Sequence, residues 1–423
     1  MRSSPIIPIL ILLAFVILID LYAFKGFRLL CNNLNSKLKF VLLSLHWLVP
    51  IIFTVSLFLI ILKRNTLLVS DDFKYFYFAI GFFILFYIPK LVFLIFHFAE
   101  DILKLTARIV KYFTTETTVA NETAEKISRS KFLSMIGIVV AAIPFVSIFH
   151  GIFRGRFNFK VNKETLRFDN LPKSFDGIKV LQFSDMHIGS FYGNEEKIEA
   201  AVELMNSQEP DIVLFTGDMV NNSAFELDRF IDILSKIKAT IGKYSILGNH
   251  DYGEYVAWNS EEEKRKNFES LISKHKECGF NILLNENDTI NINGENISII
   301  GIENWGLPPF PQYGDFRKAA KGTENSLFKI LLSHDPSHWD AEILNKTDID
   351  LTLSGHTHGF QFGIKIPGFH WSPVKYKYPR WSGLYYENNQ YLYVNIGLGY
   401  IAFPGRVGSP PEIALFELKS TLV

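Results

Sequence analysis

The stretch IKVLQFSDMH, residues 178–187, decides the fold, because a largely apolar run ends in Asp185 and His187. Such a run is typical of a strand that is buried on both faces of a parallel sheet. The chain repeats this arrangement four more times. The further runs are DIVLFT before Asp218, YSIL before Asn249, FKILLS before His334, and DIDLTLS before the GHTH of residues 355–358.

The polar groups that follow these runs are of the kinds that bind metals. Ligands bind at the carboxyl ends of parallel strands, so five such strand ends predict one shared site. Carboxylate oxygen together with neutral imidazole suits Mn, Zn or Fe better than Mg or Ca. Asp218 stands alone after its strand, and an aspartate can bridge two metals about 3.5–4 Å apart, a spacing that clamps a phosphate. The prediction of a dinuclear centre depends on the conjunction of the five groups, since each is weak alone.

Composition divides the chain of 423 residues into two regions. Hydrophobic residues make up 48% of it, and many of its 39 phenylalanines lie in the first 150 residues. Four apolar stretches there reach the length of about 20 residues that crosses a bilayer, at 6–24, 40–62, 75–98 and 132–149. We therefore predict a transmembrane region over residues 1–150, with the lipid bilayer as its partner, and a globular domain over 151–423.

Two charged residues interrupt the predicted spans. Asp20 lies in the first, and Lys90, next to Pro89, lies in the third. We expect Lys90 to extend toward a membrane interface and Pro89 to kink its helix. Three histidines in or beside the spans are expected at the interfaces: His46, His97 and His150.

The orientation of the membrane region is predicted from its lysines and arginines. Ten of them flank one side of the four spans and nine the other, which favours an external or periplasmic globular domain. The sequence SRSKFL at 128–133 is similar to a degraded twin-arginine export signal, although a basic flank of a membrane helix explains it equally well.

The globular region alternates strand-like runs with helical stretches, which is an α/β pattern. Helices are predicted at 195–207, 225–237 and 262–278. The later strands, at 296–301, 391–396 and 412–417, have less helix between them. This spacing predicts two packed sheets with helices outside, in place of one doubly wound sheet.

The ordered series DMH, GD, GNHD, SHD and GHTH resembles the calcineurin-like metallophosphoesterases, from about Val161 to the C-terminus. The later stretches RWSGLY, YVNIGLGY and PPEIALFEL resemble the membrane-attached or exported bacterial branch. Phe360 stands where that branch often has glycine, which implies a narrower pocket near His358. The resemblance implies a four-layer αββα sandwich, here preceded by the four-helix transmembrane region.

The resemblance also implies the residues of the site. One divalent ion would be held by Asp185, His187, Asp218 and His358, and a second by Asp218, Asn249, His334 and His356. A hydroxide bridging the two ions would attack phosphorus. His250 would contact the phosphate and protonate the leaving oxygen, and Asp251 would orient the imidazole of His250.

The leading interpretation is a membrane-anchored phosphodiesterase that acts on a lipid-linked or envelope phosphate ester, with a nucleotide-sugar lipid pyrophosphatase as a close variant. The alternative is a membrane transducer or transporter whose metal domain senses or scaffolds without turnover. Paired polar residues inside several spans would favour transport. A binding module without activity is disfavoured because all the ligand residues and His250 are present. Nucleic acid is not expected as a partner, since 43 basic residues balance 43 acidic ones and no basic stripe appears.

Two aromatic loops, at 305–313 and 369–381, are candidates to frame the substrate, to touch the bilayer, or to pack against the second sheet. The later loop carries Lys375, Lys377 and Arg380, which would meet a phosphate or remain solvated. The natural substrate and the oligomeric state are left open.

Overall fold

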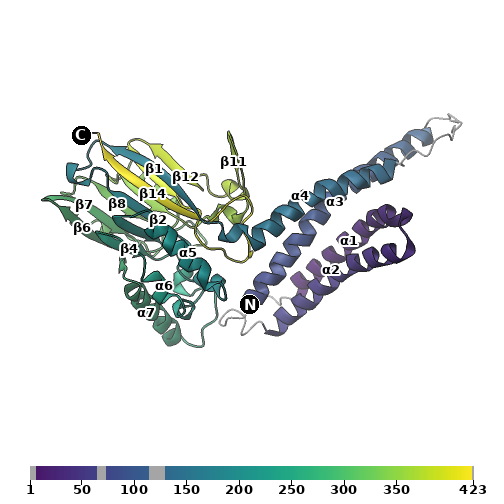
Figure 1. Cartoon of the computed structure of the whole chain (residues 1–423), viewed down its shortest axis with the longest axis horizontal. Helices are drawn as coiled ribbons and strands as arrows, with labels where there is room; N and C mark the ends of the chain where they lie inside the picture. Colours follow the sequence, from purple (N-terminus) through teal and green to yellow (C-terminus); the bar gives the residue numbers. More distant parts are fainter. Residues whose placement is uncertain (1–5, 64–72, 114–128, 422–423) are drawn as a thin grey trace. The chain divides into compact units, whose positions relative to one another are not determined.

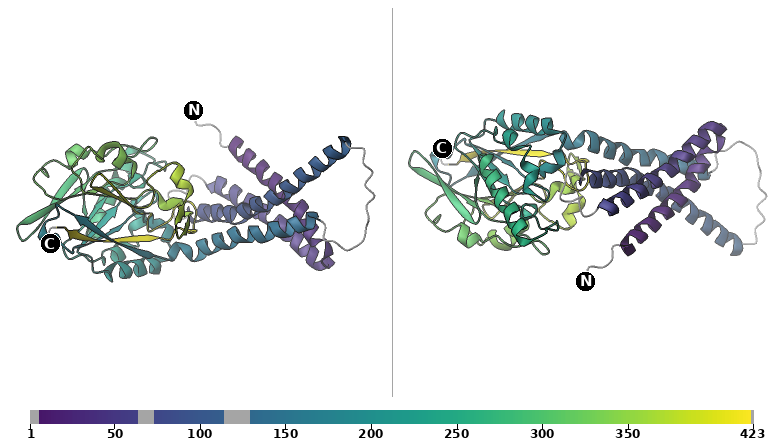
Figure 2. Two further views of the ribbon diagram at one scale, coloured as in Figure 1. Left: turned by 90° about the horizontal axis from the view of Figure 1, so that it is seen from above. Right: turned by 90° about the horizontal axis from the view of Figure 1, so that it is seen from below.

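The computed structural model describes residues 6–63, 73–113 and 129–421. It divides into two compact units. Among the described residues the first unit holds 6–63, 78–113 and 129–150, which are the long helices apart from a few end residues, and the second holds the rest, with all the described strands. Figures 1 and 2 show the long helices of the first unit, and the strands and shorter helices of the second. Ser128, which opens the export-like stretch, and the basic residues Arg2, Arg64 and Lys126 lie outside the described residues.

The first unit consists of four long helices, and each is long and apolar enough to cross a membrane. Only 11–22% of the most apolar window of each helix is buried, so most of its apolar side chains face outward, as they must when the surroundings are lipid. The four predicted spans are confirmed as helices, and each extends beyond its apolar stretch. Their bounds are Ile6–Leu30 (α1), Ser36–Lys63 (α2), Phe73–Phe113 (α3) and Arg129–Phe153 (α4).

Inside this unit the structure corrects the expectation for Lys90, through its contact with Asp20. Because α1 continues to Leu30, Asp20 lies well inside the helix and is fully buried. Lys90 does not extend away from the bundle, since its ammonium group forms an ion pair with Asp20. The phenol of Tyr87 donates a hydrogen bond to the same carboxylate at 2.7 Å. A carboxylate that helices bury in an apolar unit needs such partners, because no water is there to solvate it.

Two of the three membrane histidines have polar partners on another helix, and their expected place at the membrane interfaces stays a prediction. Nε2 of His46 lies 3.1 Å from the backbone oxygen of Asp20. Nε2 of His97 lies 3.3 Å from the hydroxyl of Ser134 on α4. Each imidazole thus obtains a polar partner from another helix, which the sequence of its own helix does not reveal.

The second unit contains two six-stranded sheets and one small hairpin (Figure 1). In the first sheet β2, β3, β4 and β5 are parallel, and β14 pairs antiparallel with β2 and parallel with β1. In order across that sheet the strands are Lys160–Phe168 (β1), Glu412–Ser420 (β14), Lys179–Phe183 (β2), Ile212–Thr216 (β3), Gly242–Ile246 (β4) and Asn281–Ile282 (β5).

In the second sheet four parallel strands are flanked by one antiparallel strand at each edge. In order they are Gly383–Glu387 (β12), Gln390–Val394 (β13), Leu351–Ser354 (β9), Lys329–Leu332 (β8), Glu295–Gly301 (β7) and Glu286–Ile292 (β6). The separate hairpin pairs Ile364–Ile366 (β10) with Phe369–Trp371 (β11).

The two sheets pack face to face, and successive side chains of one strand enter different cores. Val180 faces a core that it shares with Ile330 and Leu353 of the second sheet, whereas Leu181 faces a core that it shares with helices. This division follows from the two-residue period of a strand, and it explains why the central runs are apolar throughout.

Helices cover the outer face of each sheet, but unequally. On the first sheet lie Glu195–Asn206 (α5), Ile231–Leu234 (α6) and Glu261–Glu277 (α7). Among the residues that the structure describes, the second sheet is covered by Phe316–Ala319 (α8) and the short turn Trp339–Ile343. The predicted αββα arrangement is therefore observed, with one thin outer layer.

The stretch 225–237 does not form the single helix that was predicted. It forms two short pieces, a tight 3-10 turn at Ala224–Leu227 and α6. The carboxylate of Glu226 turns back to accept backbone N–H groups of residues 221–223. That capping arrangement fixes a tight first turn, and the chain must reorient before the helix resumes.

Candidate metal centre

The candidate ligands lie together because the strands that precede them are parallel. Asp185 follows β2, Asp218 follows β3 and Asn249 follows β4, at one edge of the first sheet. His334 follows β8 and His356 follows β9 in the second sheet. Hydrogen bonds join the loops, from Asp185 N to Gly217 O and from Gly355 N to His334 O, both 2.9 Å. All five predicted strand ends therefore meet at one place in the sandwich.

The first group of ligand atoms belongs to Asp185, His187, Asp218 and His358. One ligand atom from each lies within 4.8 Å of all the others, and all four residues are buried. Nε2 of His187 lies 3.0 Å from Nε2 of His358, which in turn lies 3.2 Å from a carboxylate oxygen of Asp185. Nitrogens with lone pairs at such short range need a cation or a shared proton between them.

A second group adjoins the first through Asp218. Nε2 of His334 lies 3.3 Å from Oδ2 of Asp218 and 3.3 Å from Nδ1 of His356. Nδ1 of His356 also lies 2.8 Å from Oδ1 of Asn249. Asp218 therefore contacts both groups, which is the position that a bridging carboxylate requires.

The backbone of the site is held in an uncommon conformation. Five of the seven candidate ligands have positive φ angles: Asp185 (51°), His187 (44°), Asp218 (60°), His356 (73°) and His358 (52°). Residues with a Cβ seldom adopt this left-handed region, and such strain clusters at functional sites. Gly355 allows the crowding that results, because a Cβ there would lie 2.4 Å from Oδ2 of Asp185.

The electrostatics of the site suit cations. Burial alone would raise the pKa of Asp185 and of Asp218, but the neighbouring histidines hold both well below the usual value. Burial lowers the pKa of His187 and of His356, so both are neutral imidazoles at neutral pH. Burial opposes protonation of His334 as well, yet the charge of Asp218 raises the pKa of His334 to about 10.

These protonation states decide whether the side chains are in the forms that bind metal ions. Anionic carboxylates and neutral imidazoles are the forms that bind divalent ions. Protonated His334 balances the charge of Asp218, and a metal ion bound there would displace that proton. The donor set therefore fits divalent metals, with Asp185, Asp218, the histidines and the Asn249 amide as the groups available to hold them.

The predicted role of Asp251 is wrong. Its carboxylate does not contact the imidazole of His250, because it accepts four backbone N–H groups, from Asp218, Met219, Val220 and Gly248, at 2.8–3.2 Å. The imidazole of His250 is oriented by the backbone oxygen of Asn221, 2.8 Å from its Nδ1. Asp251 therefore fixes the loops that carry the ligands, and His250 keeps its place beside Asp218.

The sequence did not reveal the side chains that contact the candidate ligands on the side away from the other ligand atoms. The hydroxyl of Tyr378 lies 2.8 Å from Nε2 of His356 and donates to Asp335 at 3.4 Å. Because His356 Nε2–H can donate to that hydroxyl, Nδ1 is left to face the metal group. Such partners set the tautomer of a ligating histidine. The SHD motif contained Asp335, and the aromatic loop 369–381 contained Tyr378, but nothing in the sequence indicated that either side chain would contact His356.

Two further side chains support the site. The hydroxyl of Tyr255 accepts from the Asn249 amide nitrogen at 2.8 Å, which turns the amide oxygen of Asn249 toward His356. Arg406 is 1% exposed, and its guanidinium donates to the backbone oxygens of Ile396 and Gly399 and lies 3.4 Å from Nδ1 of His358. A buried arginine so distant along the chain gave no local signal of this contact.

A pocket of about 440 Å³ opens over both groups of ligand atoms. Both aromatic loops contribute to it, with Phe310 from the first and Val374, Lys377 and Tyr378 from the second. Of the three places considered for these loops, the one beside the candidate ligands is the one that this lining favours. Phe360, 59% exposed, stands at its rim near His358. Of the three basic residues in the second loop, Lys377 alone lines this pocket, and Arg380 pairs with Asp340 and Glu387.

Comparison with known proteins agrees with this geometry. Residues 178–360 match the model of the family described as calcineurin-like phosphoesterase. Residues 2–156 match that of a probable calcineurin-like phosphoesterase, transmembrane domain. The chain is 32% identical over 307 residues to the uncharacterized metallophosphoesterase YkuE of Bacillus subtilis, covering 70% of this chain and 99% of that protein.

It is also 30% identical over 261 residues to a transmembrane protein with metallophosphoesterase domain from Danio rerio, covering 59% of this chain and 55% of that protein. The chain thus spans about half the length of this second relative. The ordered ligand groups, the two packed sheets and the four apolar helices are all explained together: the chain belongs to the calcineurin-like metallophosphoesterase family, and it is a membrane member of that family.

Proposed function

We propose that this protein is a membrane-anchored, metal-dependent phosphodiesterase that acts on a lipid-linked or envelope phosphate ester. The observation that carries the proposal is the pair of ligand groups that share Asp218 beneath an open pocket. Asp185, His187, Asp218 and His358 would hold one divalent ion, and Asp218, Asn249, His334 and His356 a second. Such ions supply a nucleophile at neutral pH and neutralise charge that develops on the phosphate oxygens.

The remaining polar groups of the pocket have separate tasks in this proposal. Nδ1–H of His250 donates to the backbone oxygen of Asn221, which holds the ring in place and leaves Nε2 to exchange a proton with the leaving ester oxygen. Lys377 reaches the pocket from the loop after β11 and places a positive charge beside an incoming phosphate. Tyr378 and Tyr255 hold His356 and Asn249 in the orientations described above.

A diester is favoured over a monoester by the walls of the pocket. Beside the ligands and their neighbour His250, Lys377 is the one cation among the described lining residues, and the other side chains at the wall are largely apolar or aromatic: Tyr255, Phe310, Phe360, Pro373, Val374, Tyr378 and Ile401. A diester carries one negative charge where a monoester carries up to two, and it presents two ester groups to apolar walls. The membrane helices favour an ester that is attached to lipid.

The test compares bis(p-nitrophenyl) phosphate with p-nitrophenyl phosphate, using the full chain in detergent after chelation and addition of Mn or Zn. We expect metal-dependent turnover, faster with the diester, and a strong reduction in His250→Ala. His370→Ala is the matched control, because His370 is exposed and does not line the pocket. Faster monoester turnover would contradict the diester preference.

A second candidate, a transducer or transporter, is favoured by one observation. Asp20 of α1 and Lys90 of α3 are paired inside the membrane unit, with His46 of α2 and Tyr87 beside them. Polar residues paired between spans mark transport and relay sites in other membrane proteins. Two bound metals without hydrolysis of either ester would favour this candidate over the phosphodiesterase.

The side of the membrane that carries the catalytic unit is also a proposal. The count of basic residues favours the external side. Alkaline phosphatase and green fluorescent protein fused in turn to the C-terminus distinguish the two sides. Phosphatase activity without fluorescence is expected, and the reverse pattern would overturn the assignment.

A further inference from the structure

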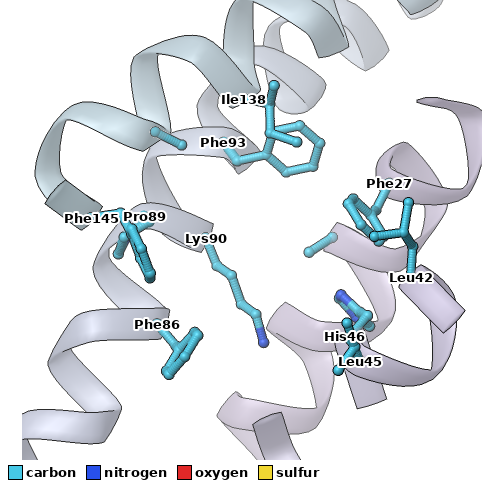
Figure 3. Close-up of a pocket in the computed structure, with 12 residues that line it drawn as sticks. Phe27, Leu42, Leu45, His46, Phe86, Pro89, Lys90, Phe93, Ile138 and Phe145 are labelled. Carbon is cyan, nitrogen blue, oxygen red and sulfur yellow. The ribbon is translucent and has the colours of Figure 1, made fainter. Parts of the chain in front are cut away.

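A cavity of about 370 Å³ lies within the membrane unit, in the range of small-ligand sites, about 300–1,000 Å³. All four helices line it, and ten of its twelve lining residues are apolar (Figure 3). They are Ala23, Phe27, Leu42, Leu45, Phe86, Pro89, Phe93, Ile138, Ala141 and Phe145. Since the unit has apolar surfaces toward lipid, the molecules that can reach such a cavity carry hydrocarbon.

The other two lining residues, Lys90 and His46, place nitrogen atoms at this cavity (Figure 3). The ammonium group of Lys90 has three N–H donors. Among the described residues its hydrogen-bonded partner is Asp20, and it lies 4.6 Å from the centre of the Tyr87 ring. The ammonium therefore retains donors for an acceptor that enters the cavity.

The charges of this cluster decide which acceptor fits. Asp20 and Lys90 together carry no net charge, and Tyr87 adds a neutral hydroxyl. A phosphate or carboxylate drawn to Lys90 would also approach the buried carboxylate of Asp20, and that repulsion is strong where water is excluded. An uncharged oxygen accepts from Lys90 without this cost.

We infer that the membrane unit binds a single-chain lipid that bears an uncharged oxygen group, a hydroxyl or an ester carbonyl. The hydrocarbon chain occupies the space between Phe27, Phe86, Phe93 and Phe145, and the oxygen accepts a hydrogen bond from Lys90. This site lies wholly within α1–α4, and it does not depend on whether the catalytic unit hydrolyses phosphodiesters.

The test uses a long-chain fatty alcohol that carries a photoactivatable diazirine and an alkyne tag, added to the full-length protein in detergent. Two matched probes have the same chain, one without the hydroxyl and one as its phosphate ester. Labelled peptides are located by mass spectrometry. We expect the alcohol to label α1–α4 peptides around the cavity, more than either matched probe, and excess unlabelled alcohol to displace it.

Two substitutions on α4 form the matched pair. Ala141→Phe fills the cavity, whereas Ala142→Phe adds the same ring on the exposed side of the same helix. We expect Ala141→Phe to lower labelling about tenfold, equivalent to ~1.4 kcal/mol of lost affinity, and Ala142→Phe to leave it unchanged. The double variant Asp20→Asn with Lys90→Met removes the ammonium without leaving an unpaired charge, and it should abolish the preference for the alcohol over the hydrocarbon.

Three results would overturn the inference. Equal labelling in Ala141→Phe and Ala142→Phe would show that the cavity is not the site. Equal labelling by alcohol and hydrocarbon in the wild type would show that the oxygen is not recognised, and stronger labelling by the phosphate ester would assign the site to an anionic lipid. The competition experiment with unlabelled alcohol requires no variant, so it decides the matter even if Ala141→Phe does not fold.

Discussion

In the membrane unit, buried Asp20 pairs with Lys90, whereas in the catalytic unit Asp185 and Asp218, equally buried, pair with histidines. Among the described residues, no lysine or arginine forms an ion pair with either of the latter two. A buried carboxylate without a cation is costly. Protonated His334 balances the charge of Asp218, whereas His187 beside the same carboxylate is a neutral imidazole, so the two carboxylates have more negative charge than this one proton offsets. The membrane cluster is therefore complete within the protein, and the catalytic cluster calls for metal ions.

The largest expected effect follows from removing the carboxylate that both ligand groups share. Asp218→Asn should lower metal-dependent diester turnover by more than about 1,000-fold, since the Lewis-acid effect of metals amounts to several kcal/mol. Turnover and metal content are measured on the same samples. Asp232→Asn, an exposed aspartate in α6, serves as the control and should retain wild-type activity. Substantial turnover in Asp218→Asn would show that Asp218 does not bridge the ions.

A smaller effect is expected from breaking the ion pair between Asp20 and Lys90, in which each charge already has its partner within the protein. Lys90→Met leaves Asp20 buried without a cation, which should lower the free energy of unfolding of the membrane unit by about 3–5 kcal/mol. Adding Asp20→Asn to Lys90→Met should restore much of it. Denaturant titration in detergent micelles measures both.

The exposed pair of Lys25 and Asp101 provides the control for this prediction. Their charged groups lie 3.2 Å apart, and the Lys25 side chain is 63% exposed. Lys25→Met should therefore change the free energy of unfolding by only about 0–1 kcal/mol. If Lys90→Met were as mild as Lys25→Met, the claim that Asp20 depends on Lys90 would be wrong.

The next largest effect concerns the side chains that hold the candidate ligands in place. Tyr378→Phe removes the hydroxyl that contacts Nε2 of His356, and we expect a 10- to 100-fold loss, by order of magnitude, in metal affinity or activity. Metal titration followed by turnover measures it. Tyr376→Phe is the control, since Tyr376 is 77% exposed and does not line the pocket. If the two variants had the same metal affinity and turnover, the hydroxyl of Tyr378 would have no role in holding His356.

The smallest effect concerns the rim of the pocket. Phe360→Gly removes an exposed ring whose backbone has a left-handed φ of 55°, a conformation that glycine adopts readily. The KM for an aryl diester should rise a few-fold, by roughly 0.5–1 kcal/mol of lost ring contact, with kcat unchanged. Phe369→Ala, outside the pocket, should leave both constants as they are. A loss of kcat in Phe360→Gly would mean that Phe360 acts on the ligands and not on substrate.

The sequence indicated where the candidate ligands would lie because their positions depend on a local rule. Each ligand group follows a parallel strand, so the strand brings Asp185 or His334 to the shared edge independently of the conformation of the loops. The residues behind the ligands follow no such rule. Tyr378 and Arg406 reach His356 and His358 through loops, and their contacts depend on how those loops pack.

Two of the wrong expectations have the same origin. Asp251 is next to His250 in the sequence, which suggested that it orients the imidazole, but the tight turn directs its carboxylate toward four backbone N–H groups. Asp20 and Lys90 are 70 residues apart, so each was considered within its own helix. Pairing between helices is a property of packing, and composition and periodicity do not contain it.

The most direct test of the central claim is a titration of the chelated full-length wild-type protein with Mn or Zn, in which bound metal per chain and diester turnover are followed together. We expect two equivalents to bind per chain, with turnover that reaches its maximum only when the second is bound. Full turnover in the presence of chelator, or saturation at a single equivalent, would contradict the dinuclear centre built around Asp218.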